Sequence, residues 1–183
     1  MILSSYKAGF RVKGLSVAKI RANARNVREL LMPTGECTDL EAFVENLENF
    51  GITYDVVDDS FLPKGTEASC IPEKRLIYIS ESTYAGICRN DERARFTIFH
   101  ELGHLLLAHS RTFNREISDE FPIFENSEWQ ADQFAAEILM PLEIILSKGL
   151  RTAVDLQKEF GVSYQAAACR LKKLRAKREI KNA

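Results

Sequence analysis

The sequence predicts an α+β fold in which amphipathic helices surround a small antiparallel sheet and one buried helix. Helical spacing of apolar residues recurs in several stretches, strand alternation occurs between residues 52 and 80, and residues 91–107 are apolar almost all round. The 183 residues suit one compact domain or one core with a small appendage, and 45% hydrophobic with 28% charged residues is typical of a globular protein.

Two amphipathic helices are expected first. Residues 17–31 carry apolar side chains at helical spacing with basic residues on the other faces, and Pro33-Thr34-Gly35 stops the run. Residues 39–49 show a second stripe, which Gly51 closes as a C-terminal cap. The stripe residues are Ile20, Ala24, Val27, Leu30, Leu31, Leu40, Phe43, Val44 and Leu47.

The next stretch predicts β structure. Residues 52–57 alternate Ile52, Tyr54 and Val56 with polar residues, and a second β segment, residues 68–80, is interrupted at Pro72-Glu73-Lys74. Together they suggest a small antiparallel sheet.

The best-marked helix begins at Asn90 or Asp91, a suitable N-cap with acid in the first turn, and continues to Leu107. After a polar loop, Ser127 with Gln130 three residues later predicts a capping box that opens another helix. Pro141 ends that helix or starts the next. Residues 152–160 and 163–177 then predict two helices joined through Gly161-Val162.

The formal net charge of −1 conceals a strong asymmetry. Residues 1–28 carry seven Lys/Arg and no Asp/Glu, and residues 170–183 carry seven Lys/Arg against one Glu, which leaves −14 for the stretch between them. An acidic body is therefore flanked by two basic ends.

The chain shows no apolar run long enough for a membrane span and no signal-peptide core before Lys7, so a cytoplasmic location is expected. The scattered Cys37, Cys70, Cys88 and Cys169 contain no C-x-x-C pair, and we expect them to be reduced and structural.

The chemistry-bearing motif is His100-Glu101-Leu102-Gly103-His104, the H-E-x-x-H pattern. Residues four apart on a helix are separated by about 40° in azimuth, so both imidazoles can bind one metal ion while Glu101 reaches its water. Zinc suits this set best. Burying two histidines and a glutamate in an apolar helix would be costly without such a partner.

A third metal ligand is needed, and several downstream residues are candidates. Glu128 is favoured because it shares a helix face with Asp132 beside small residues, so Glu128 can complete the shell and Asp132 can accept a hydrogen bond from a ligand histidine. A helix-dipole role for Glu128 and a solvated position for Asp132 are the alternatives. His109 should point away, as a helix-end or surface histidine. The other candidates are Glu116, Asp119, Glu120 and Glu125.

Three blocks in this order resemble the ImmA/IrrE family of metallopeptidases: residues 95–107 around the H-E-x-x-H motif, residues 128–141, and residues 160–171. The resemblance covers roughly residues 39–174. It implies a compact zincin-like fold, zinc held by His100, His104 and Glu128, and Glu101 as catalytic acid/base. On this basis residues 39–148 would form the peptidase core, residues 1–38 an N-terminal basic helical segment, and residues 149–183 a C-terminal helix-turn-helix-like segment with a basic tail.

The resemblance also implies a role. Members are typically encoded in phage, mobile-element or stress-response loci and cleave helix-turn-helix repressors or antitoxin-like regulators, which relieves repression. The group that would stabilise the oxyanion is left open among Tyr78, Tyr84, Tyr164 and several arginines, with core packing the alternative for each tyrosine.

The basic tail leaves a second functional class open. Gly161 at the turn and Ser163 as cap give the tail a helix-turn-helix layout, and Arg170, Lys172 and neighbouring cations make DNA contact conceivable, although secondary. The alternatives to a zinc endopeptidase are therefore a non-proteolytic DNA-binding regulator and a toxin–antitoxin component that uses the zincin fold as a scaffold.

Overall fold

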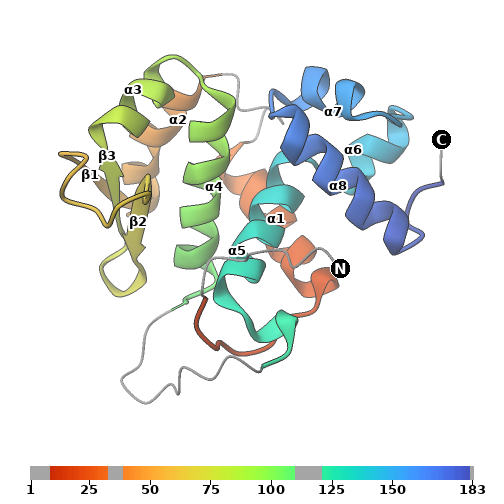
Figure 1. Ribbon diagram of the computed structural model, residues 1–183, viewed down its shortest axis with the longest axis horizontal. Helices are drawn as coiled ribbons and strands as arrows, with labels where there is room; N and C mark the ends of the chain where they lie inside the picture. Colours follow the sequence, from red (N-terminus) through yellow and green to blue (C-terminus); the bar gives the residue numbers. More distant parts are fainter. Residues whose placement is uncertain (1–8, 33–38, 110–120, 182–183) are drawn as a thin grey trace.

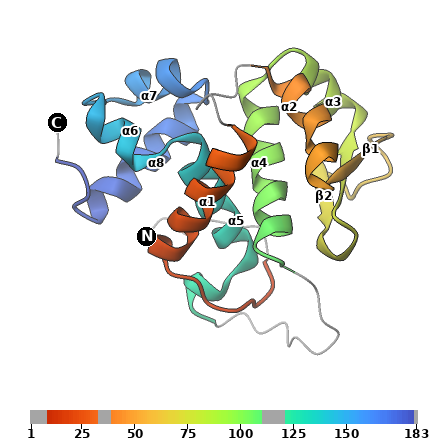
Figure 2. The same ribbon diagram turned by 180° about the vertical axis from the view of Figure 1, so that it is seen from behind.

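The computed structural model describes residues 9–32, 39–109 and 121–181. Its central helix α4, Glu92–Leu106, separates a three-stranded sheet with two covering helices from the remaining helices (Figure 1; seen from behind in Figure 2). The elements are α1 (Val17–Leu31), α2 (Leu40–Asn46), a 3-10 turn (Leu47–Phe50), β1 (Thr53–Val57), β2 (Ala68–Ile71), a 3-10 turn (Pro72–Lys74), β3 (Leu76–Ser80), α3 (Glu81–Cys88), α4, a 3-10 turn (Ile123–Glu125), α5 (Ser127–Leu139), α6 (Leu142–Ser147), α7 (Ala153–Phe160) and α8 (Tyr164–Ala176).

The sheet is mixed, so the prediction of an antiparallel sheet was wrong in part. The strand order is β1-β3-β2, with β2 antiparallel to β3 but β1 parallel to it. Pro72–Lys74 turns β2 directly into β3, with Arg75 in the left-handed region (φ 52°). The longer connection over residues 58–67 instead carries the chain to the far edge, which lets β1 run the same way as β3.

The core lies between α4 and its neighbours on both sides. Ile77 and Ile79 of β3 are fully buried, as are Ile98 and Leu102 of α4.

Two local predictions needed correction. Asn126, not Ser127, caps α5 by accepting from the Trp129 N–H, and α3 was not predicted. Within the described residues, no helix combines the length and apolar character needed to cross a membrane.

Helices α4 and α5 approach closely because small residues face each other. A Cβ added at Gly103 would lie 3.0 Å from the Cα of Ala131 and 3.1 Å from its carbonyl oxygen. These neighbours are backbone atoms, so they could yield only if the helices moved apart. The approach sets the distance between the two helices that carry the chemistry-bearing residues.

We expect Gly103→Ala to destabilise the protein. In a helix interior, alanine is favoured over glycine by about 1 kcal/mol, but forcing a methyl group against α5 should cost about 1–3 kcal/mol. Urea-induced unfolding should show a lower midpoint for the variant. A variant more stable than the wild type would mean that the helix pair tolerates the methyl group.

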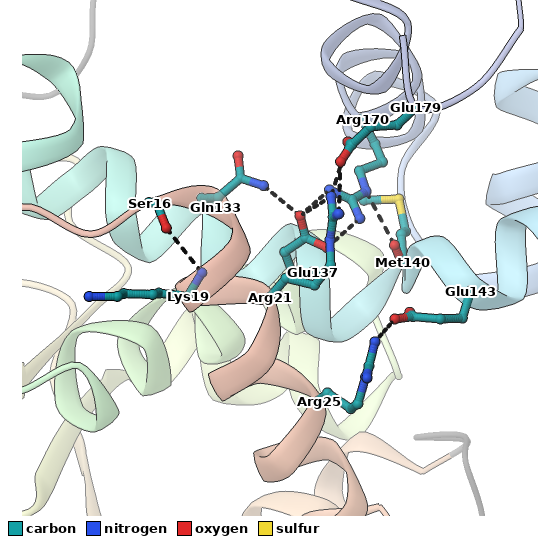
Figure 3. Close-up of polar contacts among 10 residues, drawn as sticks. All are labelled: Ser16, Lys19, Arg21, Arg25, Gln133, Glu137, Met140, Glu143, Arg170 and Glu179. Atoms are coloured by element: carbon teal, nitrogen blue, oxygen red, sulfur yellow. Dashed lines mark hydrogen bonds and ion pairs between the residues drawn. The ribbon is translucent and has the colours of Figure 1, made fainter. Parts of the chain in front are cut away.

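A network of ion pairs joins the C-terminal segment to α5 and α1 (Figure 3). Its members are Arg21, Glu137, Arg170 and Glu179. Glu137 of α5 accepts hydrogen bonds from Arg170 of α8 (2.7 and 2.9 Å) and from Arg21 of α1 (2.9 and 3.1 Å). Arg21 also binds Glu179 at 2.7 and 3.0 Å. Arg170 is 2% exposed and paired, so it is unavailable for the DNA contact that the sequence allowed.

The thiols of Cys70, Cys88 and Cys169 are free. Cys88 and Cys169 are exposed, whereas Cys70 is half-buried on β2. Cys37 lies outside the described residues.

Candidate metal centre

Helix α4 presents two imidazoles from one face. Asp91 caps the helix through the N–H groups of Arg93 and Ala94, which fixes the start predicted from sequence. His100 and His104 follow on successive turns, and their Nε2 atoms lie 3.0 Å apart. Glu101, between them in sequence, is 9% exposed.

Helix α5 completes the group. Glu128, in its first turn, places Oε1 3.2 Å from His104 Nε2 and Oε2 3.4 Å from His100 Nε2. One ligand atom from each of these three residues lies within 4.8 Å of the others. The structure thus brings together the three ligands named from the sequence.

The hydrogen bond to Asp132 orients the His100 imidazole, with Nε2 on the side of His104 and Glu128. Asp132, one turn after Glu128 on α5, has Oδ1 2.8 Å from His100 Nδ1. A carboxylate only accepts, so Nδ1–H donates to it, and Nε2 can offer its lone pair once it is deprotonated.

His109 contacts the second imidazole; it follows the end of α4, as one of the two predicted positions required, but it is buried rather than on the surface. It is 4% exposed, and its Nδ1 lies 3.0 Å from His104 Nδ1. Helix α4 ends at Leu106, and Ala108 takes a left-handed conformation (φ 54°), which turns the chain back. The azimuth calculated for a continuing helix therefore does not apply.

Gln130 fixes the direction of this second chain of hydrogen bonds. Its Nε2 donates to the carbonyl oxygens of Lys13 (2.9 Å) and Phe124 (2.7 Å), so its Oε1 accepts from His109 Nε2 at 3.0 Å. His109 Nδ1 is then the acceptor, and His104 Nδ1–H donates to it. Neutral His104 therefore carries its proton on Nδ1, and in that form its Nε2 lone pair faces His100 and Glu128. Gln130 had been assigned to a capping box, so sequence reasoning missed this role.

The charged groups perturb one another strongly. Burial alone would lower the pKa of His100, but hydrogen bonds to Asp132 and Glu128 outweigh it and raise that pKa to about 10. Burial would raise the pKa of Glu128, yet the hydrogen bonds with His100 and His104 hold it well below its usual range. Burial raises the pKa of Glu101 and lowers that of His109 to about 4.

A cavity of about 660 Å³ opens onto these residues. His100, Glu101, His104 and Glu128 line one wall, and β2 contributes Ala68–Ile71 opposite them. β3 pairs with one side of β2, and no strand among residues 9–32, 39–109 and 121–181 pairs with its other edge. An unpaired strand edge is a surface to which an extended peptide can add by main-chain hydrogen bonds.

The donor set fits a small divalent ion. Bonds of about 2.0–2.1 Å in tetrahedral geometry place donor atoms about 3.3 Å apart, and the three observed separations are 3.0, 3.2 and 3.4 Å. Two imidazoles and one carboxylate at the wall of a cavity would hold such an ion through three protein ligands. This is the arrangement of catalytic rather than structural zinc sites.

The remaining candidates lie elsewhere. Glu125 is bound to Arg11 at 2.6 Å, and Glu116, Asp119 and Glu120 lie outside the described residues. None of Tyr78, Tyr84 and Tyr164 lines the cavity. Tyr78 contacts the ring of Phe61, Tyr84 stacks on Tyr54, and Tyr164 is exposed on α8.

Comparison with known families assigns the chain. The model of the peptidase M78 family, described as the IrrE N-terminal-like domain, matches residues 36–172. The chain belongs to this family. The match confirms the resemblance inferred from sequence and makes the protein a metallopeptidase-like member with a candidate His-His-Glu metal site.

A solved structure, a Mycobacterium tuberculosis transcriptional regulator, is similar in fold with a TM-score of 0.50 at 16% identity. The alignment covers 84% of this chain and 50% of the other, so the present chain spans about half the length of that protein. A search of curated proteins gave no match.

Proposed function

We propose that this protein is a zinc-dependent endopeptidase in which His100, His104 and Glu128 hold the ion and Glu101 is the catalytic acid/base. The observation that carries the proposal is the convergence of three ligand atoms beside a buried carboxylate at the wall of a cavity. Both histidines are oriented through Nδ1, by Asp132 and His109. A site that only stabilised the fold would not need an open cavity beside Glu101.

The chemistry follows from the positions of the side chains. When bound, zinc supplies a Lewis acid that polarises the scissile carbonyl and acidifies water. Glu101 accepts the proton of the attacking water and delivers it to the leaving amine nitrogen. Burial raises the pKa of Glu101 toward the working pH, which suits a group that must both take and give a proton.

The unpaired edge of β2 supports a polypeptide substrate. An extended segment can add to this edge through main-chain hydrogen bonds and place one peptide bond over the metal ligands. Ser69 and Ile71 line the cavity along this path. From the family resemblance, we propose a helix-turn-helix repressor or antitoxin-like regulator as the substrate and residues 39–148 as the peptidase core.

Co-expression with a candidate helix-turn-helix regulator, chosen from the neighbouring genes, tests the proposal. We expect the regulator to be cut by protein containing zinc, spared after the metal is chelated, and cut again when zinc is restored. Intact regulator in all three states, co-purifying with the protein, would favour the toxin–antitoxin alternative. Binding of a DNA duplex through α7 and α8 would favour the DNA-binding alternative.

The hydrogen bonds to the ligand histidines give a separate prediction. We expect His109→Ala and Asp132→Ala each to weaken zinc binding about 10–100-fold, because each leaves one imidazole without its orienting partner. Competition with a chromogenic chelator measures the affinity. Glu125→Ala, which removes a carboxylate bound to Arg11, is the control and should bind zinc as the wild type does. Equal affinity in all four proteins would refute the orienting role.

Zinc binding should release about one proton near pH 7. The raised pKa of His100, about 10, means that the metal-free imidazole is protonated, and Nε2 must lose its proton to bind the ion. Zinc affinity should therefore fall as the pH falls. Calorimetry in two buffers of different ionisation enthalpy measures the release, which Asp132→Asn should reduce. A binding heat independent of the buffer would contradict the assignment.

A further inference from the structure

A second cavity, of about 590 Å³, lies at the end of α8 and is lined mainly by cations. Arg175 comes from the last turn of α8, Arg178 and Lys181 from the residues that follow, and Arg151 from the segment before α7. Leu146 and Ile180 form the apolar part of the cavity wall. The cavity does not include any residue of the metal centre.

One nitrogen of the Arg175 side chain is hydrogen-bonded and another has no hydrogen-bond partner among the described residues. Its Nη2 donates to the carbonyl oxygen of Arg151 at 2.8 Å, which fixes the plane of the guanidinium. Its Nε is buried and finds no hydrogen-bond partner among residues 9–32, 39–109 and 121–181. The guanidinium is therefore held at the wall of the cavity with Nε shielded from solvent.

The single carboxylate in the wall does not neutralise these cations. Both oxygens of Glu179 accept hydrogen bonds from Arg21, at 2.7 and 3.0 Å, as part of the ion-pair network with Glu137 and Arg170 (Figure 3). No ion pair is found for the side chains of Arg151, Arg175, Arg178 or Lys181 within the described part of the chain. The cavity therefore carries an excess of positive charge that a single carboxylate ligand would not balance.

We propose that this cavity binds a small phosphorylated ligand through Arg175, Arg151, Arg178 and Lys181. A phosphoryl group has several acceptor oxygens and up to two charges, and guanidinium groups bind it through paired hydrogen bonds. The apolar surface of Leu146 and Ile180 accommodates the remainder of the ligand. The proposal is independent of peptidase activity.

Titration calorimetry with inorganic phosphate and with pyrophosphate, at constant ionic strength set by chloride, tests the site. We expect both anions to bind, pyrophosphate more tightly, and Arg175→Gln to weaken binding about tenfold or more. Because Arg175→Gln also alters a buried contact, Lys181→Gln serves as a second variant on an exposed side chain. Lys172→Gln, an exposed cation on α8 outside the cavity, is the matched control and should bind as the wild type does.

Two results would overturn the proposal. Phosphate binding that is the same in all four proteins would place the anion elsewhere, for example at the metal centre. Absence of binding by either anion, with the same variants weakening association with a DNA duplex, would assign these cations to a nucleic-acid backbone instead.

Discussion

Glu101→Gln should abolish peptide hydrolysis while leaving zinc bound. The amide has the size of the carboxylate but cannot accept the proton of the attacking water, and general acid–base catalysis contributes about 10²–10⁴-fold to such rates. The proposed ligands His100, His104 and Glu128 are untouched, so one zinc per chain should remain. Cleavage of the regulator measures the rate, and metal analysis of the same sample measures the stoichiometry.

A matched control separates this effect from a general loss of charge. Glu45 is exposed on α2, away from the cavity, and Glu45→Gln should cleave at the wild-type rate. Cleavage by Glu101→Gln at the wild-type rate would disprove the proposed mechanism. Loss of zinc from that variant would show that Glu101 supports the metal site rather than moving a proton.

The sequence could predict that the three candidate metal ligands lie together, because the two helices that carry them are regular. The spacing of His100 and His104 fixes their shared face, and Ala131 beside Gly103 allows Glu128 to approach. His109 could not be placed in the same way, since a single left-handed residue, Ala108, reverses the chain after the helix ends. Few periodicity rules extend past a helix terminus.

The sheet shows the same limit at a larger scale. The alternation of residues 52–57 and 68–80 located the strands, but strand direction depends on which edge a loop reaches, and residues 58–67 do not encode this in their pattern. α3 was missed because its sequence, Glu81–Cys88, has only a short apolar stripe. Tertiary packing rather than periodicity stabilises so short a helix.

Sequence also gave no indication of which charges are buried. Arg170 belongs to a run of basic residues that suggested a solvated or DNA-facing surface, yet its side chain is 1% exposed and bound to Glu137, which is equally buried. A single acidic residue on another helix decides the difference, and no local pattern links the two positions.

Glu137→Gln should therefore be the most destabilising single substitution proposed for the fold. It removes the charge that Arg170 and Arg21 share, and breaking a buried ion pair by neutralising one partner costs about 3–5 kcal/mol. The free energy of unfolding in urea measures the loss at pH 7. Burial would raise the pKa of Glu137, but its arginine partners lower it, so this contribution is present above the unfolded pKa and is lost as the pH falls through the folded value.

Two comparisons decide whether the buried charge is the cause. The exposed pair Arg25–Glu143, whose side chains are 56% and 51% exposed, is the control, and Glu143→Gln should cost less than about 1 kcal/mol. Glu137→Leu combined with Arg170→Met removes both members of the buried pair and should destabilise less than Glu137→Gln alone, because no unpaired charge of Arg170 remains. If the double variant were the less stable of the two, packing rather than uncompensated charge would explain the loss.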